Sequence, residues 1–430
     1  MLDLSVYPAI AWPLFLRVRQ TLGGPPEIAD LEGAVEAAVA SQAHRIEAGK
    51  TYAIGVGSRG IARLADIVEA LIRALRRRGA DAFIFPAMGS HGGATAEGQK
   101  EVLETLGVTE ARMGVPIRAR MDARPLAEVE PGLTAYASVD ALEADGIILV
   151  ARVKPHTAFH GPIESGVCKM LAIGLGKQRG ASSVHAVGFA RFAEVIPKVA
   201  RTVLEHIHMP FSLAIVENGH DRPALVEALV PDGLEAREAA LLEKARAWMA
   251  RLPFDQIDVL VVGEIGKNIS GDGADPNVTG RYAPKGVSGG PDVQKLVYLN
   301  LTLETHGNGM GVGMADIVTE QLYRQLDLAK TYTNAFTSTE MIPAKIPVVM
   351  PNDHDAIELA LRTLNGRRPE AARVVAIPNT LKLEEMVISE PLWAEAEQKG
   401  CVRLTDPEPA RFDERGNAPV LAGLRLYADR

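Results

Sequence analysis

Apolar runs of strand length alternate with helix-spaced patterns along the first part of the chain. Residues 52–56 and 82–86 have the composition of short buried strands. The stretch between them, 61–78, repeats apolar side chains at helical spacing, namely Ile61, Leu64, Ile67, Leu71 and Leu75. Gly79 is the expected end of this helix, because glycine commonly follows the last helical turn. The pattern predicts a strand–helix–strand unit with parallel strands.

The same alternation continues to the end of the chain. Further strand candidates lie at 146–153, 211–217, 257–266, 295–304 and 372–378. At 430 residues, the chain exceeds the length at which a single hydrophobic core stops growing. We therefore expect an α/β protein with two domains, residues 1–255 and 256–430, each with a mostly parallel sheet flanked by helices, and an active site in the crevice between them.

Three short segments rich in glycine and polar residues follow predicted strands. They are GSRG at 57–60, AMGSHGGAT at 87–95 and KPHTAFHG at 154–161. In parallel sheets, ligands bind beyond the carboxyl ends of the strands. These three loops are therefore predicted to meet at one site.

Histidines in two of these loops are candidates for acid–base chemistry. His91 lies between small residues directly after a strand, where its imidazole would be exposed to a ligand. His156 and His160 share the third loop, and the pattern does not distinguish which of the two acts on a ligand. Two histidines four residues apart on a helix could bind a metal, but Pro155 and Gly161 disfavour a helix here.

Two glycine-rich segments have some features of nucleotide-binding loops. Glycines 174, 176 and 180 surround Lys177, which would suit an anion cradle at a helix N-terminus, but their spacing is not that of a Walker A loop. The segment 306–316 carries glycines without the spacing of the dinucleotide fingerprint.

Composition narrows the classes of partner. A formal charge of −8, without long runs of one sign, disfavours nucleic acid as a partner. The two cysteines, Cys168 and Cys401, cannot form a disulfide framework, which fits a reducing compartment. The N-terminal stretch has neither a basic leader nor an apolar span of membrane length. We expect a cytoplasmic protein with a small-molecule substrate and no membrane partner, whose oligomeric state the sequence leaves open.

The order of these motifs resembles a known family. GSRG, GSHGGAT and KPH are followed by ESGVCK, which ends at Lys169, and by His185, 16 positions further on. This arrangement resembles the nickel-pincer-dependent lactate racemases and related 2-hydroxyacid racemases. The resemblance implies that Lys169 carries a covalently attached nickel-pincer nucleotide, a pyridinium thioamide/thiocarboxylate mononucleotide. It also implies that His185 is the nickel ligand.

The resemblance implies roles for the remaining motif residues. His91 and His156 match the two family histidines that act as acid and base on the substrate hydroxyl. Arg59 matches the family arginine near the substrate, where a guanidinium can bind a carboxylate with two hydrogen bonds. The implied cofactor contacts are Ser58, Gly166 and Gly176, and all of these residues fall in the N-terminal domain.

The implied reaction is racemisation or epimerisation of a 2-hydroxy acid. The proton on the carbon that bears the hydroxyl is too weakly acidic for a side-chain base near neutral pH. Removal of hydride avoids this difficulty and requires an electron-accepting cofactor. Two histidines, one for each face of the substrate, would move the hydroxyl proton.

The sequence also departs from the family pattern. The segment between His156 and Lys169 is longer and reads GPIESG in place of a serine-glycine-glycine-arginine run, and the aspartate that precedes the family's threonine-arginine pair is missing. In the C-terminal domain, which would close over the site, the family's glutamine and lysine are three residues apart. Here the candidates for these contacts are Lys267, Arg281, Gln294 and Lys295. These differences favour a different substrate.

Two other classes of protein fit the same loops. A nucleotide-dependent oxidoreductase of the NAD(P) type would use Lys169 as a phosphate contact, with a releasable cofactor and net redox turnover. A non-catalytic binding protein for an acidic small molecule would bind its ligand without hydrogen exchange and without nickel. The particular 2-hydroxy acid is not specified by the sequence.

Overall fold

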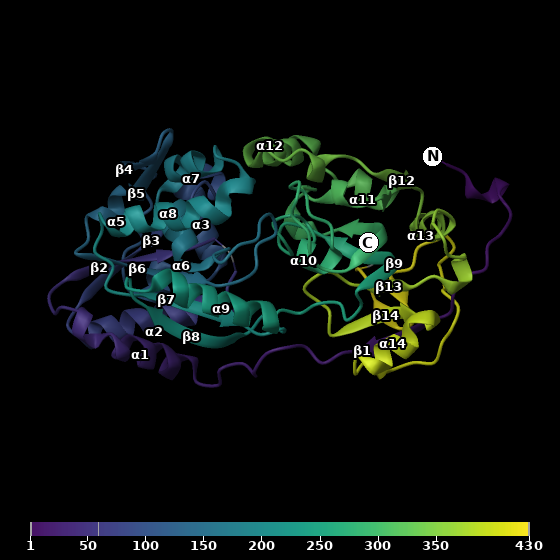
Figure 1. The fold of residues 1–430 in the computed structure, drawn as a ribbon, viewed down its shortest axis with the longest axis horizontal. Coiled ribbons are helices and arrows are strands. Elements are labelled where there is room, and N and C mark those ends of the chain that lie inside the picture. The colour runs from purple at the N-terminus through teal and green to yellow at the C-terminus, as the bar shows by residue number, and fades with distance from the viewer. Residues whose placement is uncertain (1, 59, 429–430) are drawn as a thin grey trace. The chain divides into compact units, whose positions relative to one another are not determined.

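The computed structural model describes residues 2–58 and 60–428, which form two compact units (Figure 1). Residues Gly23–Met249 form one, called here the 23–249 unit. The segment up to Leu22 and the segment from Ala250 onward form the other, called here the terminal unit. Each unit has its own sheet with helices packed against it, as the alternating pattern predicts.

The division differs from the expected domains 1–255 and 256–430 at both ends. The change between units falls at 249/250, and the first 22 residues belong to the terminal unit. The N-terminal segment belongs to the terminal unit because its strand β1 (Phe15–Arg19) pairs antiparallel with β14 (Glu385–Ser389) and β15 (Val402–Arg403). A short apolar run at the start of a chain does not specify so distant a partner.

The 23–249 unit contains a five-stranded sheet in the order β3-β2-β6-β7-β8. Its strands are β2 (Thr51–Val56), β3 (Asp81–Pro86), β6 (Gly146–Arg152), β7 (Ser212–Glu217) and β8 (Pro223–Leu229). All neighbours are parallel except β7 and β8. The chain leaves β2 toward β3 on one side and leaves β6 toward β7 on the other. This reversal, where open α/β sheets bind ligands, lies between β2 and β6.

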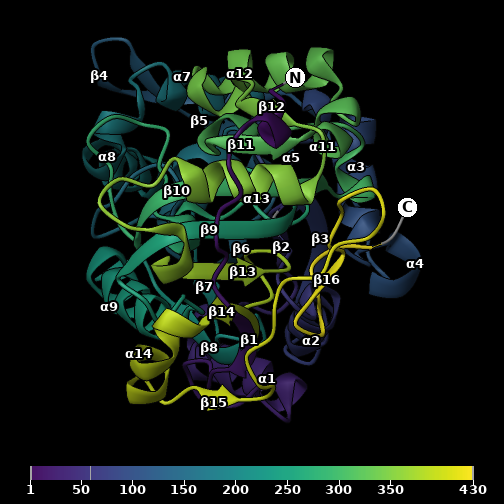
Figure 2. The same cartoon turned by 90° about the vertical axis from the view of Figure 1, so that its right-hand side faces the viewer.

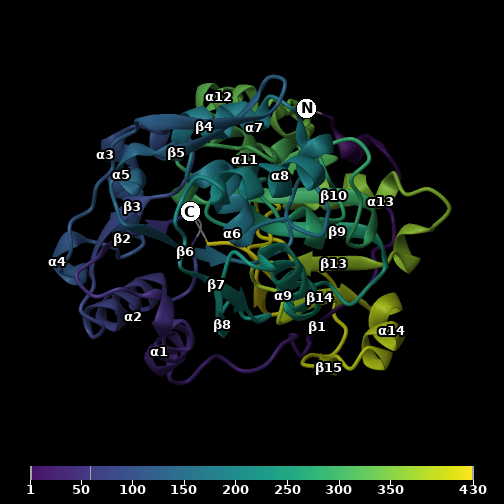
Figure 3. The same cartoon turned by 60° about the vertical axis from the view of Figure 1, so that its left-hand side comes forward.

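Helices cover both faces of this sheet (Figure 3). They are α1 (Leu31–Ser41), α2 (Leu64–Arg76), α3 (Ala96–Thr105), α4 (Glu110–Met113), α5 (Val139–Leu142), α6 (Gly166–Lys169), α7 (Lys177–His185), α8 (Phe192–Leu204) and α9 (Leu234–Trp248). Alternate residues of β2 face opposite cores: Ile54 packs with α1 and α2, and Ala53 packs with α6, α8 and α9. A hairpin of β4 (Ala123–Glu130) and β5 (Leu133–Ser138) packs against α7.

The terminal unit contains an eight-stranded sheet in the order β12-β11-β10-β9-β13-β14-β1-β15 (Figure 2). Its parallel part comprises β9 (Gln256–Ile265), β10 (Asp292–Leu301), β11 (Ile317–Thr319), β12 (Val348–Met350) and β13 (Val374–Ile377). Its helices are α10 (Pro276–Thr279), α11 (Glu320–Arg324), α12 (Leu328–Ser338), α13 (Asp353–Arg362) and α14 (Trp393–Gln398). A short hairpin, β16 (Val420–Leu421) and β17 (Leu424–Arg425), lies near the C-terminal end.

The structure confirms the predicted α/β class with mostly parallel sheets flanked by helices. The predicted strands are present within a few residues of their expected bounds. The expected location of the active site in a crevice between domains stays a prediction. Among the described residues, no helix combines the length and apolar character needed to cross a membrane.

Candidate functional site

The three predicted loops follow three adjacent parallel strands of the 23–249 unit. Ser58 comes after β2, His91 after β3 and His156 after β6. Because these strands run parallel in the order β3-β2-β6, their carboxyl ends lie at one edge of the sheet. Arg59, the predicted partner of a substrate carboxylate, lies outside the described residues.

The first two loops are joined by a direct contact. The hydroxyl of Ser58, expected as a cofactor contact, hydrogen-bonds Nδ1 of His91. A hydroxyl can either donate to or accept from an imidazole nitrogen. His91 can therefore gain or lose a proton at Nε2 without losing this partner, and its ring is exposed as expected.

Glycines shape the loop around His91. Gly92 has φ +64°, and a Cβ added there would approach the backbone of Gly98 and Gln99 at 2.5–2.6 Å. This close approach explains why GSHGG needs a glycine directly after the histidine.

The third loop fixes one nitrogen of His156. Nδ1 of His156 accepts the backbone N–H of Ala158 at 3.0 Å, so the neutral ring carries its proton on Nε2. The ring lies against Phe159, with centroids 4.5 Å apart. In this geometry His156 presents an N–H donor, and taking up a second proton would require Nδ1 to release Ala158.

Glu164 organises the loop that carries both His156 and His160. Its side chain is fully buried. It accepts hydrogen bonds from the backbone N–H groups of His156 (2.8 Å) and Gly161 (2.9 Å), and it pairs with Arg246 (2.6 Å). His160 Nδ1 lies 3.2 Å from the same carboxylate. The sequence showed Glu164 in a chemically rich stretch, but nothing in the pattern assigned it this bracing role.

Residues 166–185 form a folded-back helical segment that brings Lys169 and His185 together. Lys169 ends α6 and is followed directly by a π-helical turn, Met170–Gly174. The helical path then breaks at Lys177, which has φ +54°, and α7 packs back against the π-helical turn. Lys169 and His185 each lie eight residues from Lys177, on opposite sides of the break. Short π-helical turns occur frequently at functional sites.

Three phenylalanines connect this segment to His156. The ammonium of Lys169 lies 5.7 Å from the centroid of the Phe159 ring. The ring of His185 contacts Phe189 at 5.6 Å and Phe192 at 5.2 Å between centroids. Phe159 and Phe192 are themselves 5.4 Å apart. Lys169, His185 and His156 therefore border one aromatic cluster, which we call the phenylalanine cluster.

Burial among these rings, together with the nearby charge of Lys169, lowers the pKa of His185 to about 4. A histidine at a helix C-terminus would ordinarily be favoured in its charged form by the helix dipole. Here desolvation has the larger effect. His185 is consequently neutral at physiological pH, which is the form of imidazole that binds metals.

The two glycines expected to contact a cofactor have clear packing roles. Gly166 has φ +79°, and an added Cβ would fall on the carboxylate of Glu238. That buried carboxylate accepts the backbone N–H groups of Val167 and Cys168, and burial raises the pKa of Glu238 to about 7. A Cβ on Gly176 would lie 2.7 Å from Cα of Gly180, within the first turn of α7.

The glycine-rich segment after Lys169 does not present Lys177 as an anion-binding group. Lys177 is fully buried and donates to the carbonyl of Pro86 at 2.8 Å and to Oε1 of Gln99 at 3.0 Å. The anion cradle suggested by this spacing therefore lacks its cation.

The candidate contacts of the C-terminal domain all lie in the terminal unit. Lys267 donates to Gly271 O at 2.7 Å, and Arg281 pairs with Asp316 at 2.8 Å. Gln294 accepts the backbone N–H of Asn365 at 2.5 Å. Lys295, the fourth candidate, lies in β10.

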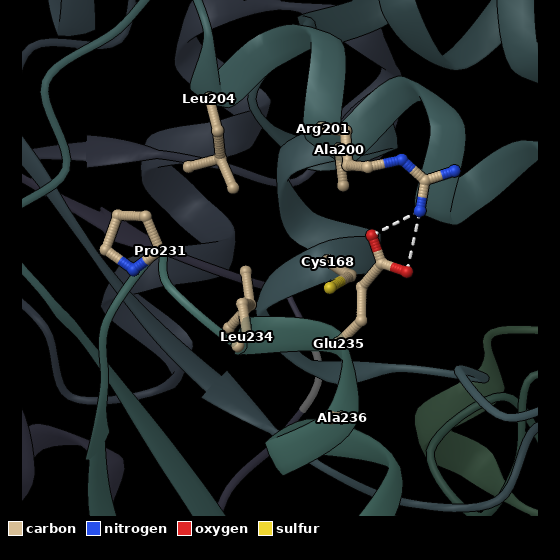
Figure 4. Close-up of a pocket in the computed structure, with 9 residues that line it drawn as sticks. Cys168, Ala200, Arg201, Leu204, Pro231, Leu234, Glu235 and Ala236 are labelled. Carbon is tan, nitrogen blue, oxygen red and sulfur yellow. Dashed lines mark hydrogen bonds and ion pairs between the residues drawn. The ribbon is translucent and has the colours of Figure 1, made fainter.

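A cavity of about 340 Å³ lies beside α8 and the start of α9 (Figure 4). Its lining comprises Cys168, Ala200, Arg201, Leu204, Pro231, Gly233, Leu234, Glu235 and Ala236. Arg201 and Glu235 form an ion pair at 2.5 Å, as Figure 4 shows. Burial raises the pKa of the Cys168 thiol, so this cysteine is a poor nucleophile. None of the predicted histidines lines this cavity.

The fold described above is similar to that of a protein of known structure. Residues 58–224 match the family described as Domain of unknown function (DUF362). The matched segment is less than half of the chain. The lactate racemase apoprotein from Thermoanaerobacterium thermosaccharolyticum superposes with a TM-score of 0.53 and 10% identity, covering 86% of this chain and 99% of that one. A protein from Thermotoga maritima matches with a TM-score of 0.46 and 14% identity, covering 65% and 72% of the two chains. No curated protein matches the sequence.

The class that these findings define is an α/β protein with the fold of the lactate racemase apoprotein. At 10% identity the likeness concerns the fold alone. The chemistry of this chain has to be argued from its own residues.

Proposed function

We propose that this protein is a racemase or epimerase of a 2-hydroxy acid that works with a nickel-pincer nucleotide attached to Lys169. The observation that carries the proposal is the convergence of Lys169 and His185 on the phenylalanine cluster, from opposite ends of the segment 166–185. The fold shared with the lactate racemase apoprotein supports the same class of isomerase.

The residues present fit the proposed cofactor. Lys169 offers a primary amine beside aromatic rings, and His185 offers a neutral nitrogen in the same environment. Within the described part of the chain, no cluster of three or more histidine, cysteine or carboxylate side chains is arranged to hold a metal. A metal bound mainly by a tethered organic group needs only one protein ligand, which His185 would supply. When bound, the nickel-pincer nucleotide supplies a hydride acceptor.

The histidines would bind the substrate and move its hydroxyl proton. His91 is suited to proton transfer at Nε2, because its Ser58 partner accommodates both protonation states of the ring. His156 is suited to donating Nε2–H to the substrate oxygen, because Ala158 occupies its Nδ1. Arg59 is proposed to bind the substrate carboxylate.

The aromatic rings around the site would exclude water from the reacting carbon. Phe159 and Phe192 are almost fully buried, at 3% and 1% exposure. A water-poor environment strengthens the electrostatic interactions between substrate and protein and protects hydride from protonation by solvent. An apolar cluster with only a few polar groups is also typical of small-molecule sites.

The proposal is tested by turnover of labelled substrates. The protein is produced together with the enzymes that make the pincer nucleotide, and enantiopure 2-hydroxy acids carrying deuterium on carbon 2 are supplied in ordinary water. We expect inversion of carbon 2 with the deuterium largely retained. The His91→Gln variant should lose this activity, and Lys100→Met, an exposed lysine on α3, serves as the control.

Other outcomes would replace the proposal with a different class. Net oxidation that needs added NAD(P) would identify a nucleotide-dependent oxidoreductase. Tight binding of hydroxy acids without inversion would identify a binding protein. Inversion with complete loss of deuterium would show proton abstraction at carbon and would contradict hydride transfer.

A further inference from the structure

We infer that the buried pair formed by Lys177 and Gln99 positions His91 relative to the segment that carries Lys169 and His185. The inference concerns the orientation of one histidine, and its catalytic consequence rests on the proposed function. Both side chains are fully buried, and neither was assigned this role by the sequence pattern.

Gln99 holds the backbone on both sides of Ser90, within the loop that carries His91. It lies on α3, and its Nε2 donates to the carbonyl of Gly89 at 2.9 Å and to the carbonyl of His91 at 3.2 Å. These two bonds use both amide hydrogens of Gln99. The backbone orientation of His91 therefore depends directly on the position of one buried side chain.

Lys177 holds Gln99 and the end of β3. Its ammonium donates to Oε1 of Gln99 at 3.0 Å and to the carbonyl of Pro86, the last residue of β3, at 2.8 Å. Because the carbonyl oxygen of the Gln99 amide is engaged by Lys177, the amide hydrogens are directed toward Gly89 and His91. Lys177 thus determines which way round the Gln99 amide is placed.

The backbone of Lys177 lies at the break between the π-helical turn and α7. Its φ of +54° is uncommon for a residue other than glycine. The neighbouring Gly176 position is crowded by β5, since a Cβ on Gly176 would approach Tyr136 O at 3.1 Å. The residue that reverses the chain between Lys169 and His185 is therefore also the residue that holds the His91 loop.

A second contact joins the same two segments. The backbone N–H of Gly89 donates to the carbonyl of Gly174, the last residue of the π-helical turn, at 3.2 Å. Gly174 and Lys177 both belong to the segment 166–185, so the loop that carries His91 is bonded to this segment directly through Gly89 and indirectly through Gln99. Movement of that segment would be transmitted to His91 through both.

The chemistry of the pair argues for more than packing. Burial of an amine in a protein core is costly, and an apolar side chain of similar length would fill the same space without that cost. Burial lowers the pKa of Lys177 to about 8, which reflects the penalty of keeping a charge there. A lysine retained at such a position is accounted for by the directional bonds that it makes.

The test compares three variants of the full-length protein produced with the cofactor-making enzymes. Gln99→Glu retains an acceptor for Lys177 but places a carboxylate oxygen against the carbonyls of Gly89 and His91. Lys177→Met removes the ammonium and keeps most of the apolar stem. Lys100→Met, the neighbour of Gln99 on the exposed side of α3, is the matched control.

Three quantities are measured on each variant. The first concerns cofactor loading, given by nickel content and intact mass. The second concerns turnover, given by kcat and KM for the substrate found in the racemisation assay. The third is the NMR titration of His91 in histidine-labelled protein, assigned with His91→Gln. We expect Gln99→Glu and Lys177→Met to retain tether and nickel, because Lys169 and His185 are unchanged. We expect kcat to fall by roughly ten- to a hundredfold with little change in KM, since small displacements of a catalytic group reduce turnover by such factors.

The NMR titration separates this inference from the proposed function. A shifted resonance and titration midpoint of His91 in Gln99→Glu, but not in Lys100→Met, supports the positioning role even if no hydroxy acid is turned over. A His91 titration and kcat equal to those of the control would overturn the inference, whatever the reaction proves to be. If Lys177→Met does not fold, Gln99→Glu alone decides the question.

Discussion

The two sheets of this protein obey the same topological rule but place different chemistry at their carboxyl ends. In the terminal unit, polar residues of the loops after β9, β10 and β13 hydrogen-bond from one loop to another. Thr302 donates to Asn268 at 2.6 Å, and Thr380 accepts the backbone N–H of Asp275 at 3.0 Å. In the 23–249 unit, the corresponding loops carry His91 and His156.

The distribution of titratable residues makes the same distinction. Eight of the ten histidines lie in the 23–249 unit, including all four near the predicted chemistry. Both sheets have a point where the strand order reverses, between β2 and β6 in one and between β9 and β13 in the other. Topology thus provides a location for a site, and the residues at that location determine whether chemistry follows.

Substitution of the site histidines should give the largest effect on turnover. His91→Gln and His156→Gln should each lower kcat by about 10²–10⁴, the usual contribution of proton transfer. His160→Gln should have a much smaller effect, because its Nδ1 faces the structural carboxylate of Glu164. Steady-state kinetics on cofactor-loaded protein measure this. If only His160→Gln lost activity, the acid–base role in this loop would belong to His160 and not to His156.

A pair of glycine substitutions tests the packing beneath Lys169. Gly166 and Gly188 both have φ +79°, but only at Gly166 does an added Cβ meet another atom, the carboxylate of Glu238. Gly188→Ala should cost about 1–2 kcal/mol for the left-handed backbone alone. Gly166→Ala should cost this amount and a further 1–3 kcal/mol for overpacking. Denaturant unfolding measures both, and equal costs would show that Glu238 moves aside freely.

The burial of Lys177 should make the free energy of unfolding depend on pH in the alkaline range. Because the folded-state pKa of Lys177 is about 8, the unfolded chain binds the additional proton between about pH 8 and 10.5. The free energy of unfolding should therefore rise with pH across this window, by up to about 3 kcal/mol relative to Lys177→Met. Thermal unfolding of both proteins from pH 7 to 10.5 measures this difference. Parallel pH profiles would show that Lys177 titrates normally.

The smallest effect is expected in the terminal unit. The side chain of Gln294 hydrogen-bonds the backbone of Asn365, and its backbone carbonyl, which accepts from Arg281, is unchanged by substitution, so Gln294→Ala should cost about 1 kcal/mol or less. We expect its kcat and KM to match those of the unchanged protein. A large loss of turnover would instead make Gln294 a substrate contact and would extend the site to the terminal unit.

Local patterns predicted the strands and the loops, because both depend on residues close in sequence. The period of apolar positions identified β2, α2 and β3, and the parallel-sheet rule placed Ser58, His91 and His156 at one edge. The pairing of β1 with β14 could not be predicted, because the two strands are more than 360 residues apart and neither is marked by its composition.

The supporting residues of the site were also beyond prediction from sequence. Glu164, Gln99 and Lys177 are ordinary surface residue types, and their importance comes from burial that only the folded chain creates. Lys177 in particular has a glycine-rich context that suggested anion binding, whereas its partners come from β3 and α3. Contacts between distant segments decide such roles.

The most direct test of the central claim is the mass of the peptide that contains Lys169, measured together with nickel content. The protein should be produced in a host that carries the enzymes of pincer nucleotide synthesis. We expect additional mass on Lys169 and bound nickel, both absent from Lys169→Ala and both present in Lys100→Met. An unmodified Lys169 peptide and no nickel under these conditions would contradict the proposed attachment of a nickel-pincer nucleotide to Lys169.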